Sequence, residues 1–153
     1  MKKLNVKPVI IGVVIICLIA GFFLLKSKMN TNQNQSSILI GKTKILAEVA
    51  DTENLRIQGL SGRDKLPEST GMLFVFDKPG MYSFWMKDMK FSLDFIWISN
   101  NQVVDLTEDV PYPKHPNESL PIYQPKTPVD HVLEVTAGFI KKEGIQIGDA
   151  VQF

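Results

Sequence analysis

Residues 91–106 read FSLDFIWISNNQVVDL and predict a β-hairpin at the centre of a sheet. Two runs rich in aromatic and β-branched residues, 91–99 and 102–106, flank the pair Asn100-Asn101. Such residues favour strands, and two asparagines between two strands favour a tight turn. Both faces of the first run are apolar, which is typical of a strand covered on both sides. We therefore place residues 91–99 in the middle of the predicted sheet.

Further runs along the chain have the apolar or alternating character of short strands. They are residues 45–50, 72–76, 81–87, 129–136 and 149–153. The second of them ends in the turn sequence Asp77-Lys78-Pro79-Gly80. Many short strands with few helices predict a mostly β fold, either a compact β-sandwich or a small barrel with one or two short helices.

Two places carry helix signals. Asp51-Thr52 caps a short helix through residue 58 that Gly59 ends, and residues 137–143 form two turns before Gly144. Between residues 111 and 128 the chain holds six of its nine prolines. Because proline cannot donate to a strand ladder, this stretch predicts a long extended loop over an edge or mouth of the fold.

The N-terminal part contains a long apolar run. Residues 9–25 read VIIGVVIICLIAGFFLL, without one charge. As a helix they extend about 26 Å, close to the ~30 Å hydrocarbon core of a bilayer. The run is longer than the apolar region of a signal peptide, Lys26 and Lys28 follow it at once, and no Ala-x-Ala cleavage site precedes the polar stretch. We predict a retained transmembrane anchor, with the membrane as its partner.

The chain is predicted to have four parts: a short basic segment (1–8), the anchor (9–25), a flexible polar linker (26–37) and one β-rich domain (38–153). Three lysines precede the anchor and two follow it, so the positive-inside rule places the N-terminus in the cytoplasm and the domain outside it. From residue 38 onward there are twelve basic and sixteen acidic residues, a net charge of −4 with neutral histidines. This balance excludes the electrostatic footprint of a nucleic-acid-binding domain.

Three carboxylates interrupt apolar strands: Glu48, Asp94 and Glu134. A buried carboxylate needs a cation or several donors, because an unpaired buried charge costs several kcal/mol. The candidate partners for Asp94 are three basic residues: Arg56, Arg63 and Lys87. Three interpretations remain open. In the first, the carboxylates belong to a structural ion-pair network. In the second, they line a polar pocket for acid–base catalysis or ligand binding. In the third, one or more of their strands lie at a solvent-exposed edge of the sheet.

Aromatic residues crowd one segment and include Phe84, Trp85, Phe95 and Trp97. Their alternation within predicted strands favours core packing over a sugar-stacking platform. Four methionines (72, 81, 86 and 89) and two histidines (115 and 131) match no ligand spacing that converges on one site. We therefore expect no metal and no cofactor.

An ordered series of short motifs then extends over residues 47–151. It consists of AEVA around Glu48, RIQGLSGR (56–63), GMLF (71–74), FWMK (84–87), Leu93-Asp94, Leu133-Glu134, Gly138, Gly144 and Gly148-Asp149. In order and spacing it resembles the bacterial and archaeal family of domains of unknown function number 192. The resemblance implies a compact β-rich fold, often exported or anchored, and no assigned activity. The family motif includes Glu48, Arg56, Arg63, Lys87, Asp94 and Glu134. A methionine usual in the family is replaced at Ser61.

Two functions are compatible with these observations. The first is a non-enzymatic binding or accessory module of the cell envelope. It would hold a polymer fragment, a peptide or a protein at a mouth formed by the proline loop and the turn between Arg56 and Arg63. The alternative is a hydrolase or lyase acting on an envelope glycan, with Asp94 and Glu134 as acid and base and Trp85 as the sugar platform.

Overall fold

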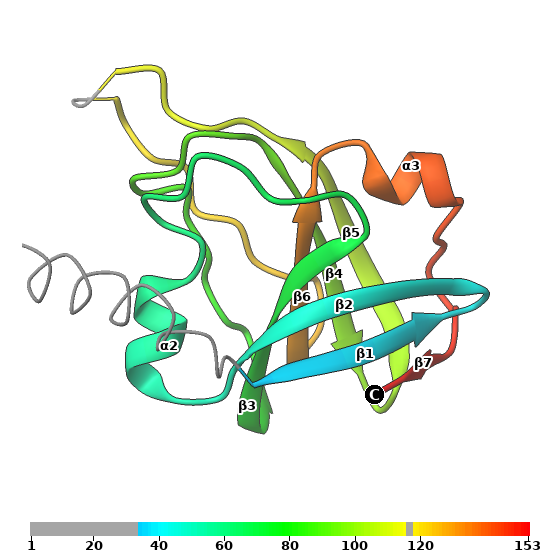
Figure 1. Cartoon of the computed structure of the whole chain (residues 1–153). Coiled ribbons are helices and arrows are strands. Elements are labelled where there is room, and N and C mark those ends of the chain that lie inside the picture. Colours follow the sequence, from blue (N-terminus) through cyan, green and yellow to red (C-terminus); the bar gives the residue numbers. More distant parts are fainter. Residues whose placement is uncertain (1–33, 116–117) are drawn as a thin grey trace, which may run out of the picture. The chain divides into compact units, whose positions relative to one another are not determined.

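The computed structural model describes residues 34–115 and 118–153 (Figure 1). Its strands are β1 (Gln35–Ile40), β2 (Thr43–Ala50), β3 (Thr70–Gly80), β4 (Leu93–Ser99), β5 (Gln102–Val110), β6 (Val129–Thr136) and β7 (Val151–Gln152). Its helices are α2 (Glu53–Gln58) and α3 (Phe139–Glu143). Among these residues no helix is long and apolar enough to cross a membrane. The predicted anchor at 9–25 lies outside the described residues.

All strands of the described part join one sheet, in the order β5-β4-β6-β3-β2-β1-β7. Neighbours run antiparallel except for β2 and β3, which are parallel and are connected through α2. Hydrogen bonds also join the start of β5 to the segment that enters β7: Val103 N–H donates to Asp149 O (2.9 Å) and Val151 N–H donates to Asn101 O (2.8 Å). The sheet is therefore curled into a half-barrel, and the prediction of a mostly β fold with two short helices is confirmed.

The central hairpin is present as predicted. β4 and β5 pair antiparallel with Ser99 opposite Gln102, and Asn100 and Asn101 both have positive φ (51° and 59°), as tight hairpin turns require. Every residue of β4 is buried, and the strand pairs with β5 on one side and β6 on the other. The two apolar faces of its sequence are thus explained by a core on each face of the sheet.

The two cores have different covers. The first contains Leu73, Ile96 and Leu133 and is closed by α3, whose Phe139 and Ile140 are buried in it. The second contains Phe74, Phe95 and other residues of the opposite face. Its cover comes from the turn after α2 and from the connection between β3 and β4. α2 and α3 lie on opposite sides of the view in Figure 1.

The structure corrects the predicted strand at residues 81–87. This segment makes a single bridge, with Phe84 N–H donating to Tyr123 O and Tyr123 N–H donating to Phe84 O, both at 2.9 Å. The alternation that predicted a strand is real, since Phe84 and Met86 are buried while Trp85 is 58% exposed. The segment buries every second side chain by lying over the sheet rather than by joining it. At the other end of the domain, β1 begins at Gln35, inside the predicted linker.

Candidate ligand-binding site

A cavity of about 330 Å³ opens between α2, β3 and the segment 81–89. Its lining is mostly apolar and aromatic. The residues are Glu53, Arg56, Ile57, Leu60, Ser61, Phe74, Phe76, Tyr82, Ser83, Phe84, Trp85, Met89 and Glu134. Pockets for small ligands have this size, this apolar lining and a few placed polar groups. The cavity is therefore the candidate functional site.

Glu134 provides the deepest polar group of the cavity. The strand register places it in one row across the sheet with Glu48 on β2, Met72 on β3 and Phe95 on β4. Its side chain is 5% exposed, and within the described ranges no hydrogen bond or ion pair reaches its carboxyl group. Burial raises the pKa of Glu134 to about 8, so the carboxyl group is mostly protonated at neutral pH.

Arg56 forms part of the cavity wall and holds α2 against the sheet. Its Nη1 donates to Asp51 O (2.7 Å) and to Val75 O (2.8 Å). Its guanidinium carbon lies 5.4 Å from the centre of the Phe76 ring, which also stacks on Tyr82 with ring centroids 3.5 Å apart. α2 begins where the Thr52 hydroxyl accepts a hydrogen bond from Leu55 N–H and ends at Gly59, with φ of 50°. Arg56 is thus a fixed cation rather than a mobile one.

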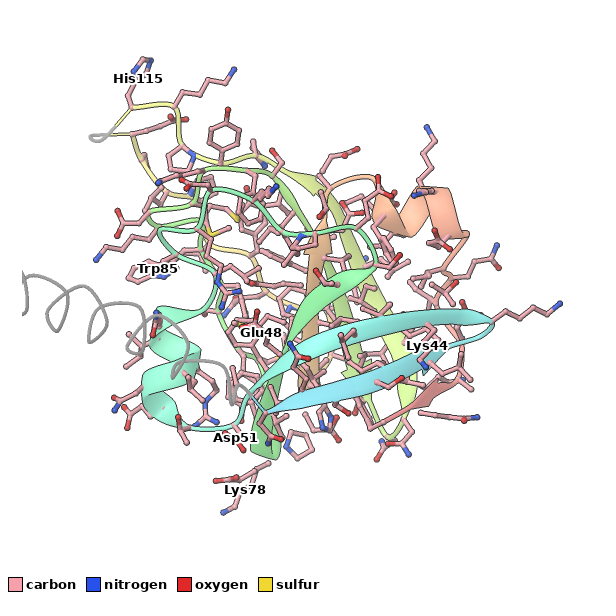
Figure 2. The ribbon with its side chains drawn as sticks, in the orientation of Figure 1. Lys44, Glu48, Asp51, Lys78, Trp85 and His115 are labelled. Carbon is pink, nitrogen blue, oxygen red and sulfur yellow. The ribbon has the colours of Figure 1, made fainter. Side chains whose placement is uncertain are left out.

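The mouth of the cavity carries exposed apolar side chains. Ile57 is 72% exposed and Trp85 is 58% exposed. A second hollow, of about 230 Å³, adjoins the first through Trp85 and includes Ile122 of the proline loop, itself 66% exposed. We call Ile57, Trp85 and Ile122 the apolar rim. Figure 2 shows Trp85 directed outward near α2. Lys87 Nζ lies 5.7 Å from the centre of the Trp85 ring. Large exposed apolar side chains gathered at one hollow are typical of binding surfaces.

Arg63, one of the basic residues predicted to pair with Asp94, pairs with Glu48 instead. Arg63 Nη1 and Nη2 donate to Glu48 Oε1 and Oε2, each at 2.6 Å, a bidentate pair that ties β2 to the turn after α2. The hydrogen bonds that Arg63 donates to Glu48 hold the pKa of Arg63 above its usual value, although burial opposes this. Glu48, labelled in Figure 2, lies on β2 between Gln35 of β1 and Met72 of β3. This pair is part of the scaffold.

Asp94 is fully buried and is satisfied by backbone alone. Its Oδ1 accepts from Asp109 N–H (2.8 Å) and its Oδ2 accepts from Ile140 N–H (3.0 Å), in the first turn of α3. The prediction that an arginine or Lys87 pairs with Asp94 is therefore wrong. Asp109 has a positive φ of 54°, which turns its N–H toward the carboxylate. Asp94 fastens β5 and α3 to β4.

Asp94 and Glu134 lie on opposite faces of the sheet. Asp94 is opposite Val135, whereas Glu134 is opposite Phe95, one residue further along β4. Since neighbouring residues of a strand point to opposite faces, the two carboxyl groups do not face one cleft. The predicted acid–base pair is therefore not assembled.

Sequence reasoning missed most of the cavity wall and one buried carboxylate. The sequence places Phe74, Phe76 and Tyr82 in predicted strands, and the signal that could have found the cavity is their aromatic density close to a glycine-terminated helix. Asp105 on β5 is buried, and its oxygens accept from Lys126 Nζ (2.9 Å) and Lys126 N–H (3.0 Å). Burial acts to raise the pKa of Asp105, but these hydrogen bonds outweigh it and hold the pKa below its usual value. Among the described residues no cluster of three His, Cys, Asp or Glu forms a metal site.

The fold and the cavity define a class of protein: a β half-barrel domain with an aromatic-lined lateral pocket. The chain belongs to the family of unknown function DUF192, described as "Uncharacterized ACR", whose model matches residues 36–153. The resemblance seen in the sequence is thereby confirmed.

Two solved structures are similar to this chain. A crystal structure of a "putative transcription regulator" from Sinorhizobium meliloti 1021 is 25% identical, with a TM-score of 0.70, and the match covers 80% of this chain and 96% of that one. A protein of unknown function from Novosphingobium aromaticivorans DSM 12444 is 24% identical, with a TM-score of 0.69, and the match covers 82% and 89%. A comparison with curated proteins gives no match.

Proposed function

We propose that this protein is a non-enzymatic binding module of the cell envelope. Residues 9–25 anchor it in the membrane, and its domain lies outside the cytoplasm and takes up an apolar group of its ligand in the cavity. The observation that carries this proposal is the cavity with its apolar rim. Burying Ile57, Trp85 and Ile122 against a ligand removes apolar surface from water, which favours association by roughly 25 cal/mol per Å² before the costs of binding are subtracted.

The placement of the carboxylates supports binding over glycan cleavage. A glycosidase of the usual kind needs two carboxyl groups about 5–9 Å apart across one cleft. Glu134 lies inside the cavity and Asp94 is bound to backbone on the opposite face. Trp85 retains its role as a platform, because its ring is exposed at the mouth.

The charge of the domain supports a ligand other than nucleic acid. The Sinorhizobium structure is named a "putative transcription regulator", and a regulator that binds DNA directly needs a basic surface. Residues 38–153 carry a net charge of −4. We therefore propose envelope polymers, peptides or proteins as ligands.

The test uses the full-length protein in lipid nanodiscs. Cell-wall fragments and envelope peptides are screened by ligand-observed NMR against the wild type, Ile57→Ala and the matched control Ile147→Ala. Ile57 and Ile147 are both strongly exposed isoleucines, but only Ile57 lines the cavity. We expect Ile57→Ala to weaken binding about tenfold and Ile147→Ala to leave it unchanged. Equal binding by both variants would refute the site.

Membrane attachment and orientation are tested separately. A periplasm-dependent or surface-dependent reporter fused after Phe153 is expected to be active, and deletion of residues 1–28 to release the domain from membranes. Activity of a cytoplasm-dependent reporter at the same position would reverse the proposed orientation.

A further inference from the structure

Glu134 is a buried residue whose carboxyl group has no partner among the residues that the structure describes. Its side chain is 5% exposed and lines the cavity, and within residues 34–115 and 118–153 it accepts no hydrogen bond. Buried polar side chains in folded proteins nearly always have a hydrogen-bond partner. Among the described residues no fully enclosed side-chain oxygen or nitrogen lacks one, so the carboxyl oxygens of Glu134 are open to the cavity, and their missing partner has to be explained there. A ligand group that donates hydrogen bonds is the explanation that the position of Glu134 in the cavity favours.

The walls around Glu134 restrict the kind of donor. Several aromatic rings line the cavity, namely those of Phe74, Phe76, Tyr82, Phe84 and Trp85. Aromatic faces attract cations, most strongly where water is excluded. The protein itself shows this attraction at the same site, with Lys87 placed over Trp85 and Arg56 over Phe76. An aromatic enclosure with one carboxyl group inside it is suited to an ammonium group.

Two other charged side chains line the cavity, Arg56 and the exposed Glu53, and their opposite charges offset each other for a ligand cation. Arg56 has its Nη1 bound to two carbonyl oxygens and forms no ion pair with Glu134 within the described ranges. The Tyr82 hydroxyl donates to Lys78 O (2.6 Å), and Glu48, in the same row of the sheet, is neutralised by Arg63. Glu53, on α2, adds a second carboxylate to the lining.

Resting on the proposed binding function, we infer that the cavity binds an ammonium group carried on an apolar stem, with Glu134 as its counter-ion. The apolar stem lies against the rings and toward the apolar rim. The ammonium group donates hydrogen bonds to the Glu134 carboxylate, and a proton leaves Glu134 for the solvent when the ligand arrives already protonated. The net charge of −4 on residues 38–153 favours the approach of such a cation.

The experiment compares three probes that share one aromatic stem and differ in charge: 2-phenylethylamine, 2-phenylethanol and 3-phenylpropanoate. Dissociation constants are measured at pH 6 and pH 8 by ligand-observed NMR with the full-length protein in nanodiscs. In the protein without ligand the pKa of Glu134 is about 8, so the fraction of molecules with an ionised Glu134 increases between pH 6 and pH 8. If only this ionised form binds the amine, the affinity for the amine should rise about 50-fold over this interval. The alcohol should change by less than about twofold.

Glu134→Gln keeps the shape of the side chain and removes its charge. In this variant we expect the amine to lose its pH dependence and to bind no better than the alcohol. Glu108→Gln, at an exposed position of β5, is the matched control and should behave as the wild type.

The outcomes separate the two proposals. Alcohol binding equal to or tighter than amine binding at pH 8 would overturn the ammonium inference and leave the binding cavity standing. Tightest binding of 3-phenylpropanoate would also overturn it and would assign Arg56 as the recognition group. Failure of all three probes, together with equal ligand binding by Ile57→Ala and Ile147→Ala, would refute the cavity itself.

Discussion

Substitution Glu134→Gln should change how the stability of the domain depends on pH. The folded protein holds the pKa of Glu134 near 8, whereas the unfolded chain has the ordinary value of 4.5. Between these two values the folded state binds more protons than the unfolded state, so stability falls as pH rises. Above about pH 8 both states have lost the proton and the loss is complete.

The size of the effect follows from the two pKa values. Each unit of pKa difference is worth about 1.4 kcal/mol, and the wild type should lose about 4 kcal/mol between pH 5 and pH 9 through this group alone. Glutamine does not titrate. The free energy of unfolding of Glu134→Gln relative to wild type should therefore increase by about 4 kcal/mol over the same interval, because all other titrations are shared by the two proteins.

The assay is urea unfolding of the full-length protein in a mild detergent, followed by tryptophan fluorescence. Both tryptophans, Trp85 and Trp97, lie in the domain, so the signal reports its unfolding. Glu108→Gln controls for removal of a charge from the surface. Its free energy of unfolding should differ from that of the wild type by the same amount at every pH. Parallel curves for wild type and Glu134→Gln, within about 1 kcal/mol, would refute the assignment of Glu134 as a buried neutral carboxyl group.

Three further predictions concern the scaffold and use the same unfolding assay. Asp94→Asn should lose roughly 2–3 kcal/mol, because one amide –NH2 would face a buried backbone N–H; an unchanged midpoint would contradict the two hydrogen bonds. A double-mutant cycle of Glu48→Gln and Arg63→Met should give a coupling energy of about 1 kcal/mol, since the bidentate pair is partly exposed, and zero coupling would count against it. Gly71→Ala should destabilise by roughly 2 kcal/mol, because the added Cβ would lie 2.7 Å from the backbone oxygen of Glu134, and wild-type stability would show that β3 and β6 separate freely.

The hairpin was predictable because its signals are local. Three signals act within sixteen residues: the strand propensity of the two runs, the apolar character of both faces of the first run, and the pair Asn100-Asn101. The structure agrees with each of them. Residues 129–136 were equally clear and form β6 with the predicted bounds. The segment 81–87 had the same period but lies outside the sheet, since periodicity records which side chains are buried and not which backbone they pair with.

The partners of the carboxylates were not predictable from spacing. A sequence shows which basic side chains could pair with a carboxylate. Asp94 is bound by two backbone N–H groups, those of Asp109 and Ile140, which are not adjacent to it in the chain. These two donors reach Asp94 only because Asp109, with its positive φ, and the first turn of α3 both lie next to β4 in the folded domain. Arg63 was a candidate partner for Asp94, but it pairs instead with Glu48 on β2, the carboxylate within reach of the turn after α2.

The cavity depended on contacts that no local pattern contains. Its walls come from α2, β3, β6 and the segment 81–89, which meet only after the parallel pairing of β2 and β3 turns the chain back across the sheet. Glu134 stands out in the sequence as an acidic residue in an apolar strand, and the structure buries it. Its role as the polar group of an aromatic pocket required the three-dimensional arrangement.

The hydrogen bonds between residues 101–103 and 148–151 set the order in which the domain is completed. They connect segments separated by about a third of the chain, and β7 then pairs with β1, far earlier in the sequence. A ribosome or a translocation channel delivers these late residues last, so the two ends of the sheet stay apart until then. The domain therefore completes its fold only once residues 148–152 are available to pair with β1 and with the start of β5.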